Sequence, residues 1–155
     1  MAGGSVTGSR TRIRLTAMAA VAATLVTGLT IRGVSDGVVA KYAGDALYTV
    51  LLYGSCVVAV PRIRPLAAGL TACGVSWAIE FFQLTPIPAE LSQRSVLARL
   101  VLGSTFNAPD LLWYAVGAAV ALLVHAVALR GAGKAARRPA GRRPVGEEAD
   151  RPPRR

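Results

Sequence analysis

The charged residues of this chain fall into short clusters that are separated by long apolar blocks. A soluble domain distributes its charges more evenly, because most of its helices and strands have a side that faces water. A helix that crosses the hydrocarbon core of a bilayer needs roughly 20 mainly apolar residues. The blocks that meet or approach this length are 15–31, 46–60, 66–84 and 111–129. The pattern is therefore typical of a multi-pass membrane protein.

The apolar blocks predict an all-α membrane protein with four transmembrane helices. The second block is short, and it reaches the required length only if residues 42–45 and Pro61 are included. Helices satisfy their backbone polar groups internally, as lipid surroundings demand. Gly117 and Ala121 have the small-xxx-small spacing that allows close helix packing in membranes. We predict a basic N-terminus over 1–14, a four-helix domain over 15–130 and a disordered basic tail over 131–155.

The distribution of basic residues predicts the orientation. The chain has 18 Lys and Arg against 8 Asp and Glu, for a net charge of +10. The bases lie mainly before the first block, between the second and third blocks, and after the fourth block. The positive-inside rule then predicts a multi-pass protein of the cell membrane with both termini on the cytoplasmic side. The first block follows basic residues as in a signal peptide, but no small-x-small cleavage site follows Ile31, so we expect an uncleaved helix.

The tail over 131–155 consists largely of Pro, Gly, Arg and Ala without an apolar period. Such a segment cannot bury enough apolar surface to offset its ordering entropy. We expect it to stay disordered and to fix the topology. Electrostatic attachment to anionic lipid is the alternative, worth about 1 kcal/mol per basic residue near the surface. Nucleic acid is not an expected partner, because no aromatic residues alternate with the arginines.

An acid lies inside the third apolar block. Placing a carboxylate at the centre of a bilayer costs about 2.5–3.5 kcal/mol, and less near the edge. Glu80 recurs with Cys73, Ser76 and Gln83 at helical spacing, which forms one polar stripe. The helix dipole also disfavours an acid toward the C-terminus of a helix. Glu80 is therefore predicted to face the protein interior.

Two further acids are expected at the same depth on the same side. Asp45 begins the second helix, and Asp110 follows Asn107 and Pro109 in a pattern that favours a helix start. Capping alone could account for both acids. The segment 85–107 carries arginines that could supply counter-charge, and we expect one of them to pair with Glu80. The predicted ligand-binding residues are Asp45, Glu80, Gln83, Arg94, Arg99 and Asp110.

The sequence contains no pattern for a metal or cofactor. Cys56 and Cys73 lie within predicted helices without a Cys-x-x-Cys spacing, and His125 is isolated in the last helix. The cluster of acids contains no histidine and no nucleophile motif. A membrane-embedded acid–base enzyme that uses Glu80 is therefore the less favoured interpretation. A proton or ion pore is not expected either, because the cytoplasmic halves of the predicted helices carry few polar residues.

Three stretches in this order, "YAGDALY", "EFFQL" and "RLVLGSTFNAPDLLWYAVG", resemble the bacterial membrane family catalogued as domain of unknown function 2809. A more distant likeness is to VanZ-like membrane proteins, which are associated with glycopeptide-antibiotic resistance. In that pattern a Glu-x-x-Gln pair precedes an arginine and a later aspartate. Glu80, Gln83 and Asp110 match it here, while Arg94 and Arg99 both remain candidates for the arginine. The resemblance implies a four-helix membrane protein with an outward-facing polar cluster, and it implies no known reaction.

The expected function is binding at the outer face of the membrane. An arginine would contact an anionic group of an envelope lipid or precursor, and the acids would hold that arginine in place. The alternative is a set of salt bridges that only locks the helices together, with no ligand.

Overall fold

The computed structural model describes residues 4–35 and 37–136, and this part of the chain contains helices and no strand. The helices are α1 (Gly4–Val34), α2 (Val38–Ala59), α3 (Pro65–Phe82), α4 (Ile87–Arg94), α5 (Val96–Leu102) and α6 (Ala108–Ala136). Four of them, α1, α2, α3 and α6, are long and apolar enough to cross a membrane. The prediction of an all-α chain with four helices of transmembrane length and apolar composition is confirmed for the described residues.

The first and fourth predicted apolar blocks lie within α1 and α6, whereas the second and third begin inside α2 and α3 and end one and two residues beyond them. The helices are longer than the blocks at both ends of the chain, because α1 begins at Gly4 and α6 continues to Ala136. Residues 131–136 thus extend the last helix. The predicted disorder of the remaining tail, 137–155, lies outside the described residues.

Helix α2 is the centre of the bundle. It contacts α1, α3 and α6, and α3 also contacts α6. Gly117 of α6 lies directly against the backbone of Ala46 on α2, where a Cβ atom at residue 117 would overlap the Ala46 carbonyl group. The small residues Ala68 and Ala72 of α3 are fully buried, next to Tyr53 and Val57. Close backbone approach through small residues is how membrane helices commonly pack.

The outward surface of the long helices is apolar. Large side chains that are 60 % or more exposed include Leu66, Leu70, Leu112, Leu123, Val124 and Val127. A soluble monomer rarely exposes apolar residues over a whole surface, whereas lipid tails cover them without cost. This surface is therefore suited to contact with lipid.

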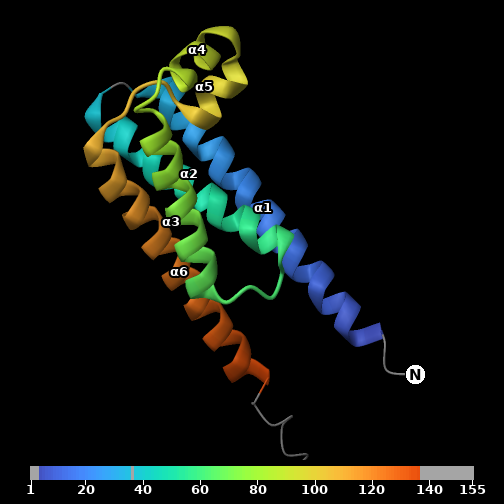
Figure 1. Cartoon of the computed structure of the whole chain (residues 1–155). Helices are drawn as coiled ribbons and strands as arrows, with labels where there is room; N and C mark the ends of the chain where they lie inside the picture. Colours follow the sequence, from blue (N-terminus) through green and yellow to red (C-terminus); the bar gives the residue numbers. More distant parts are fainter. Residues whose placement is uncertain (1–3, 36, 137–155) are drawn as a thin grey trace, which may run out of the picture.

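Helices α4 and α5 form a short hairpin at one end of the bundle. Figure 1 shows the hairpin at the end opposite to the start of α1 and the end of α6. From the sequence this segment is expected to be a connection without helices, so the hairpin corrects that expectation. Helix α4 has proline in its first turn, the Ser95 hydroxyl accepts a hydrogen bond from Ala98 N–H at the start of α5, and Gly103 ends α5 with φ 66°. Each of these residues favours the helix boundary at which it lies.

Candidate functional site

Glu80 is fully buried and faces the inside of the bundle, as predicted. Its carboxylate accepts hydrogen bonds from the backbone N–H of Asn107 at 2.5 Å and from the Tyr114 hydroxyl at 3.0 Å. Both donors are neutral, and both belong to α6 or to the residue that precedes it. The hydrogen bonds therefore join α3 to α6.

The predicted ion pair between Glu80 and an arginine is wrong. Among the described residues the ion pairs are those of Lys41, and Glu80 takes part in neither of them. The physical reason is burial: a guanidinium group would have to lose its hydration to reach this site, whereas the Asn107 N–H and the Tyr114 hydroxyl are already inside the bundle. Two hydrogen bonds satisfy the carboxylate without a counter-charge.

Lys41 pairs with the other two predicted acids. Its Nζ atom lies 3.4 Å from Asp45 on the same helix and also contacts Asp110 at the start of α6. The side chain of Asn107 donates to the same carboxylate of Asp110, and the Asp110 N–H donates to the Asn107 carbonyl at 2.9 Å. Asn107 and Asp110 thus lie at the start of α6, as the sequence predicted. The link from Lys41 to Asp110 was not predicted, although the Lys41–Asp45 part has the i, i+4 spacing of a helical ion pair.

A cavity of about 690 Å³ lies beside these residues at the hairpin end. This volume is within the range of small-molecule sites. Four of the predicted residues line the cavity: Asp45, Gln83, Arg99 and Asp110. Glu80 and Arg94 do not line it. Tyr114 lines the cavity and donates to Glu80, so the carboxylate is connected to the cavity only through this tyrosine.

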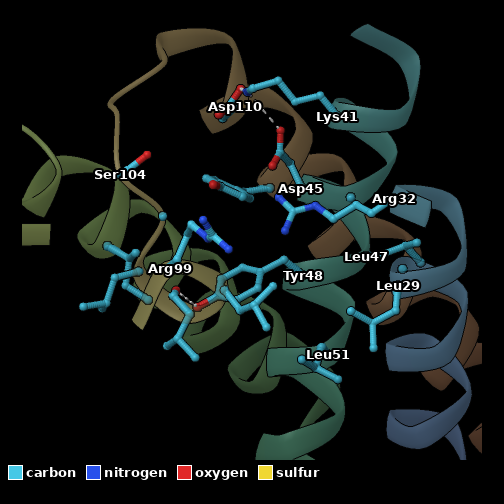
Figure 2. Close-up of a pocket in the computed structure, with 18 of the residues that line it drawn as sticks. Leu29, Arg32, Lys41, Asp45, Leu47, Tyr48, Leu51, Arg99, Ser104 and Asp110 are labelled. Atoms are coloured by element: carbon cyan, nitrogen blue, oxygen red, sulfur yellow. Dashed lines mark hydrogen bonds and ion pairs between the residues drawn. The ribbon is translucent and has the colours of Figure 1, made fainter. Parts of the chain in front are cut away.

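The cavity is amphipathic. Figure 2 shows Lys41, Asp45 and Asp110 in its upper part and Leu29, Leu47 and Leu51 in its lower part. Further apolar lining comes from Leu25, Ile79, Leu97 and Leu100. Ligand sites commonly combine an apolar wall with a few polar groups that fix orientation.

Arg32 and Tyr48 are among the charged or polar lining residues that were not predicted as site residues. Arg32 lies in the last turn of α1, and its guanidinium points into the cavity in Figure 2. Tyr48 of α2 donates its hydroxyl to the Val101 carbonyl of α5 at 2.9 Å. Arg32 follows an apolar block and was interpreted only as a charge on the outer side. The feature that could have identified Arg32 as a site residue is its position immediately after the first apolar block, at the same depth in the membrane as Asp45.

Gln83 fixes the end of the hairpin. Its Nε2 group donates to the Leu102 carbonyl at 2.6 Å, and Ser92 of α4 donates to the neighbouring Gly103 carbonyl at 2.6 Å. The Oε1 atom of Gln83 is buried and has no hydrogen-bond partner among the described residues. A Cβ atom at Gly103 would lie 2.5 Å from Gln83 Nε2 and would displace this amide, and the φ of 66° at Gly103 also favours glycine.

The opposite end of the bundle contains a separate polar contact. The Tyr53 hydroxyl is hydrogen-bonded to His125 Nδ1 at 2.8 Å. Over residues 4–35 and 37–136 no group of three or more His, Cys, Asp or Glu side chains is arranged to hold a metal ion. His125 is thus a packed residue with a tyrosine partner.

The comparisons with known proteins agree with the sequence resemblance. The model of one family, described as protein of unknown function (DUF2809), matches residues 34–118. No curated protein and no solved structure matches the chain. The matched range is more than half of the chain, and it includes all six predicted site residues but not Arg32. The chain therefore belongs to the DUF2809 family of proteins of unknown function.

Proposed function

We propose that the protein binds an anionic amphiphile of the membrane and holds its headgroup in the cavity at the hairpin end. The observation that carries the proposal is the composition of the cavity wall. Arg99 lines the same cavity as a group of leucines, so one ligand could place a charged head and an apolar chain against matching surfaces. An arginine fork suits phosphate and carboxylate groups.

The acids of the cavity leave Arg99 available for a ligand. Asp45 and Asp110 both pair with Lys41, and among the described residues neither pairs with an arginine. Lys41 is thus the shared partner of the two carboxylates, with one positive charge against two negative ones. A ligand that brings its own negative charge would complete the electrostatics of the site.

The basic residues support an orientation in which the cavity opens toward the outer leaflet. They cluster in the first part of α1, between α2 and α3, and in and after the last turns of α6, at the ends of the helices that lie away from the hairpin. The ligand would then be an envelope lipid or an envelope precursor. The VanZ-like pattern that Glu80, Gln83 and Asp110 match in the sequence would fit an accessory role in the cell envelope.

The contacts of Lys41 and Glu80 also support a purely structural role for these residues. Lys41 links α2 to α6, and Glu80 links α3 to α6, with or without a ligand. A structural role alone predicts that changes in the cavity wall that leave these links intact have no effect on lipid binding. The two interpretations are therefore separable by experiment.

The test fills the cavity from the lipid-facing helix α1. Leu29 lines the cavity and is 49 % exposed, whereas Val26 is 63 % exposed on the same helix and does not line it. Leu29→Trp should weaken binding of phosphatidylglycerol to protein in phosphatidylcholine nanodiscs, as measured by native mass spectrometry. Val26→Trp is the matched control and should bind like the wild type. Equal binding by all three proteins would refute the proposed site.

A further inference from the structure

Two arginines from different helices enter the same cavity. Arg32 comes from the end of α1 and Arg99 from α5, and Figure 2 shows their guanidinium groups pointing inward from opposite sides. Among the described residues neither guanidinium makes a hydrogen bond or an ion pair, since both ion pairs there belong to Lys41. Two like charges that share a cavity repel each other unless an anion lies between them.

We propose that Arg32 and Arg99 together hold the phosphate group of a phosphomonoester or diphosphate lipid. The inference rests on the proposed function, because it names the headgroup class for the same cavity. A phosphomonoester carries a charge of about −1.5 to −2 at pH 7 and presents three strong acceptor oxygens. It can therefore balance both arginines, whereas a phosphodiester or a carboxylate balances only one.

The two arginines are the charged lining residues that have no ion-pair partner among the described residues. The charged lining residues of the cavity are three bases and two acids, which sum to +1, and the two acids share Lys41. Asp110 also accepts a hydrogen bond from the Asn107 side chain. Glu80, the remaining acid near the site, accepts from Asn107 N–H and from Tyr114. None of these carboxylates is paired with either guanidinium, so both arginines remain free to bind an external anion.

Helix α1 is positioned to present Arg32 to the cavity. A Cβ atom on Gly44 of α2 would lie 3.9 Å from Arg32 Nε, so the arginine side chain extends across the backbone of α2 beside Asp45. The leucines at positions 25 and 29 of α1 line the same cavity. Helix α1 would thus contact both the phosphate and the apolar chain of the ligand. Since Arg32 precedes the family-matched range 34–118, this contribution belongs to a part of the chain beyond that range.

The experiment compares lipids of different charge on the full-length protein in phosphatidylcholine nanodiscs. Phosphatidic acid supplies a phosphomonoester, phosphatidylglycerol supplies a phosphodiester, and sodium phosphate supplies the free anion. We expect the wild type to bind phosphatidic acid about tenfold more tightly than phosphatidylglycerol, a difference of about 1.4 kcal/mol, because the phosphomonoester can make one additional charge-assisted contact with the second arginine. Arg32→Gln and Arg99→Gln should each remove this preference.

Matched arginine variants provide the controls. Arg94→Gln changes a base on the same hairpin that does not line the cavity, and Arg64→Gln changes one just before α3, at the other end of the bundle. Both should keep the preference for phosphatidic acid, and Arg32→Lys should retain part of it because the charge remains without the fork. Folding of each variant is checked by its thermal melting curve in phosphatidylcholine alone.

The possible failures are distinct. A wild type that binds neither anionic lipid above phosphatidylcholine would overturn the proposed function itself. A wild type that binds both anionic lipids equally, or a preference that survives in folded Arg32→Gln, would overturn the two-arginine site while leaving the cavity as a lipid site. Sodium phosphate that competes as strongly as phosphatidic acid would show a site for the free anion and overturn the assignment of a lipid.

Discussion

Tyr114 donates its hydroxyl to Glu80 across 3.0 Å, and this hydrogen bond connects α6 to a carboxylate that has no exposed surface. Tyr114 also lines the cavity, whereas Glu80 does not. Glu80, the acid inside the third apolar block, therefore lies behind Tyr114 and does not line the cavity itself. Its direct role in the structure is to join two helices, and any effect on a ligand would pass through the position of Tyr114.

Replacing Glu80 by glutamine should destabilise the protein. The amide oxygen could still accept from Asn107 N–H while its NH₂ group donates to the Tyr114 oxygen, but neither hydrogen bond would then be charge-assisted. Hydrogen bonds to charged groups contribute about 1.5–3 kcal/mol and neutral ones about 0.5–1.5 kcal/mol, so the variant should lose the difference. Thermal melting in detergent would show a lower Tm. Glu90→Gln, an exposed acid on α4, is the control and should melt like the wild type.

Replacing Lys41 by methionine should leave two carboxylates of the cavity without their common partner. Removing one member of a buried ion pair costs about 3–5 kcal/mol, and the loss here should be smaller because the Lys41 side chain is 45 % exposed and screened by solvent. Asp110→Asn in the same chain should restore part of the loss, because one uncompensated charge is then removed. The double-mutant cycle is measured by denaturant unfolding in micelles. Additive effects of the two changes would contradict a direct Lys41–Asp110 interaction.

Replacing Gly117 by alanine should separate α6 from α2. The added Cβ atom would overlap the Ala46 carbonyl, which is backbone and cannot move aside as a flexible side chain would. Gly131→Ala is the control on the same helix, because no atom lies within 4 Å of its Cβ position. Alanine is favoured over glycine in helices by about 1 kcal/mol. The control should therefore melt at the same or a higher temperature, while Gly117→Ala melts lower.

The basic clusters predict that both termini lie in the cytoplasm. Alkaline phosphatase fused after Gly37 should be active, because this residue lies between α1 and α2 at the hairpin end. A fluorescent protein fused to the C-terminus should be bright. An inactive fusion at Gly37 together with a dark C-terminal fusion would reverse the predicted orientation.

The long helices could be predicted because apolar length is a local property of the sequence. The inward direction of Glu80 could also be predicted, since its stripe with Ser76 depends only on helical spacing. The partners of Glu80 could not, because they depend on the rotation of α6 relative to α3. Which of Arg94 and Arg99 lines the cavity could not be predicted either, because the two residues belong to different short helices of the hairpin. Arg32 could not be predicted as a cavity residue, because its place there depends on how α1 packs against α2.

The two partners of Lys41 become available at different times during synthesis. Asp45 is on the same helix and leaves the ribosome with Lys41, whereas Asp110 belongs to the last helix and follows much later. While the nascent chain contains only α1 and α2, the Lys41–Asp45 pair already lowers the cost of inserting both charges near the edge of the bilayer. The arrival of α6 then adds Asp110 and draws the last helix onto α2. The lysine thus serves first as a local counter-charge and later as the docking point for the final segment.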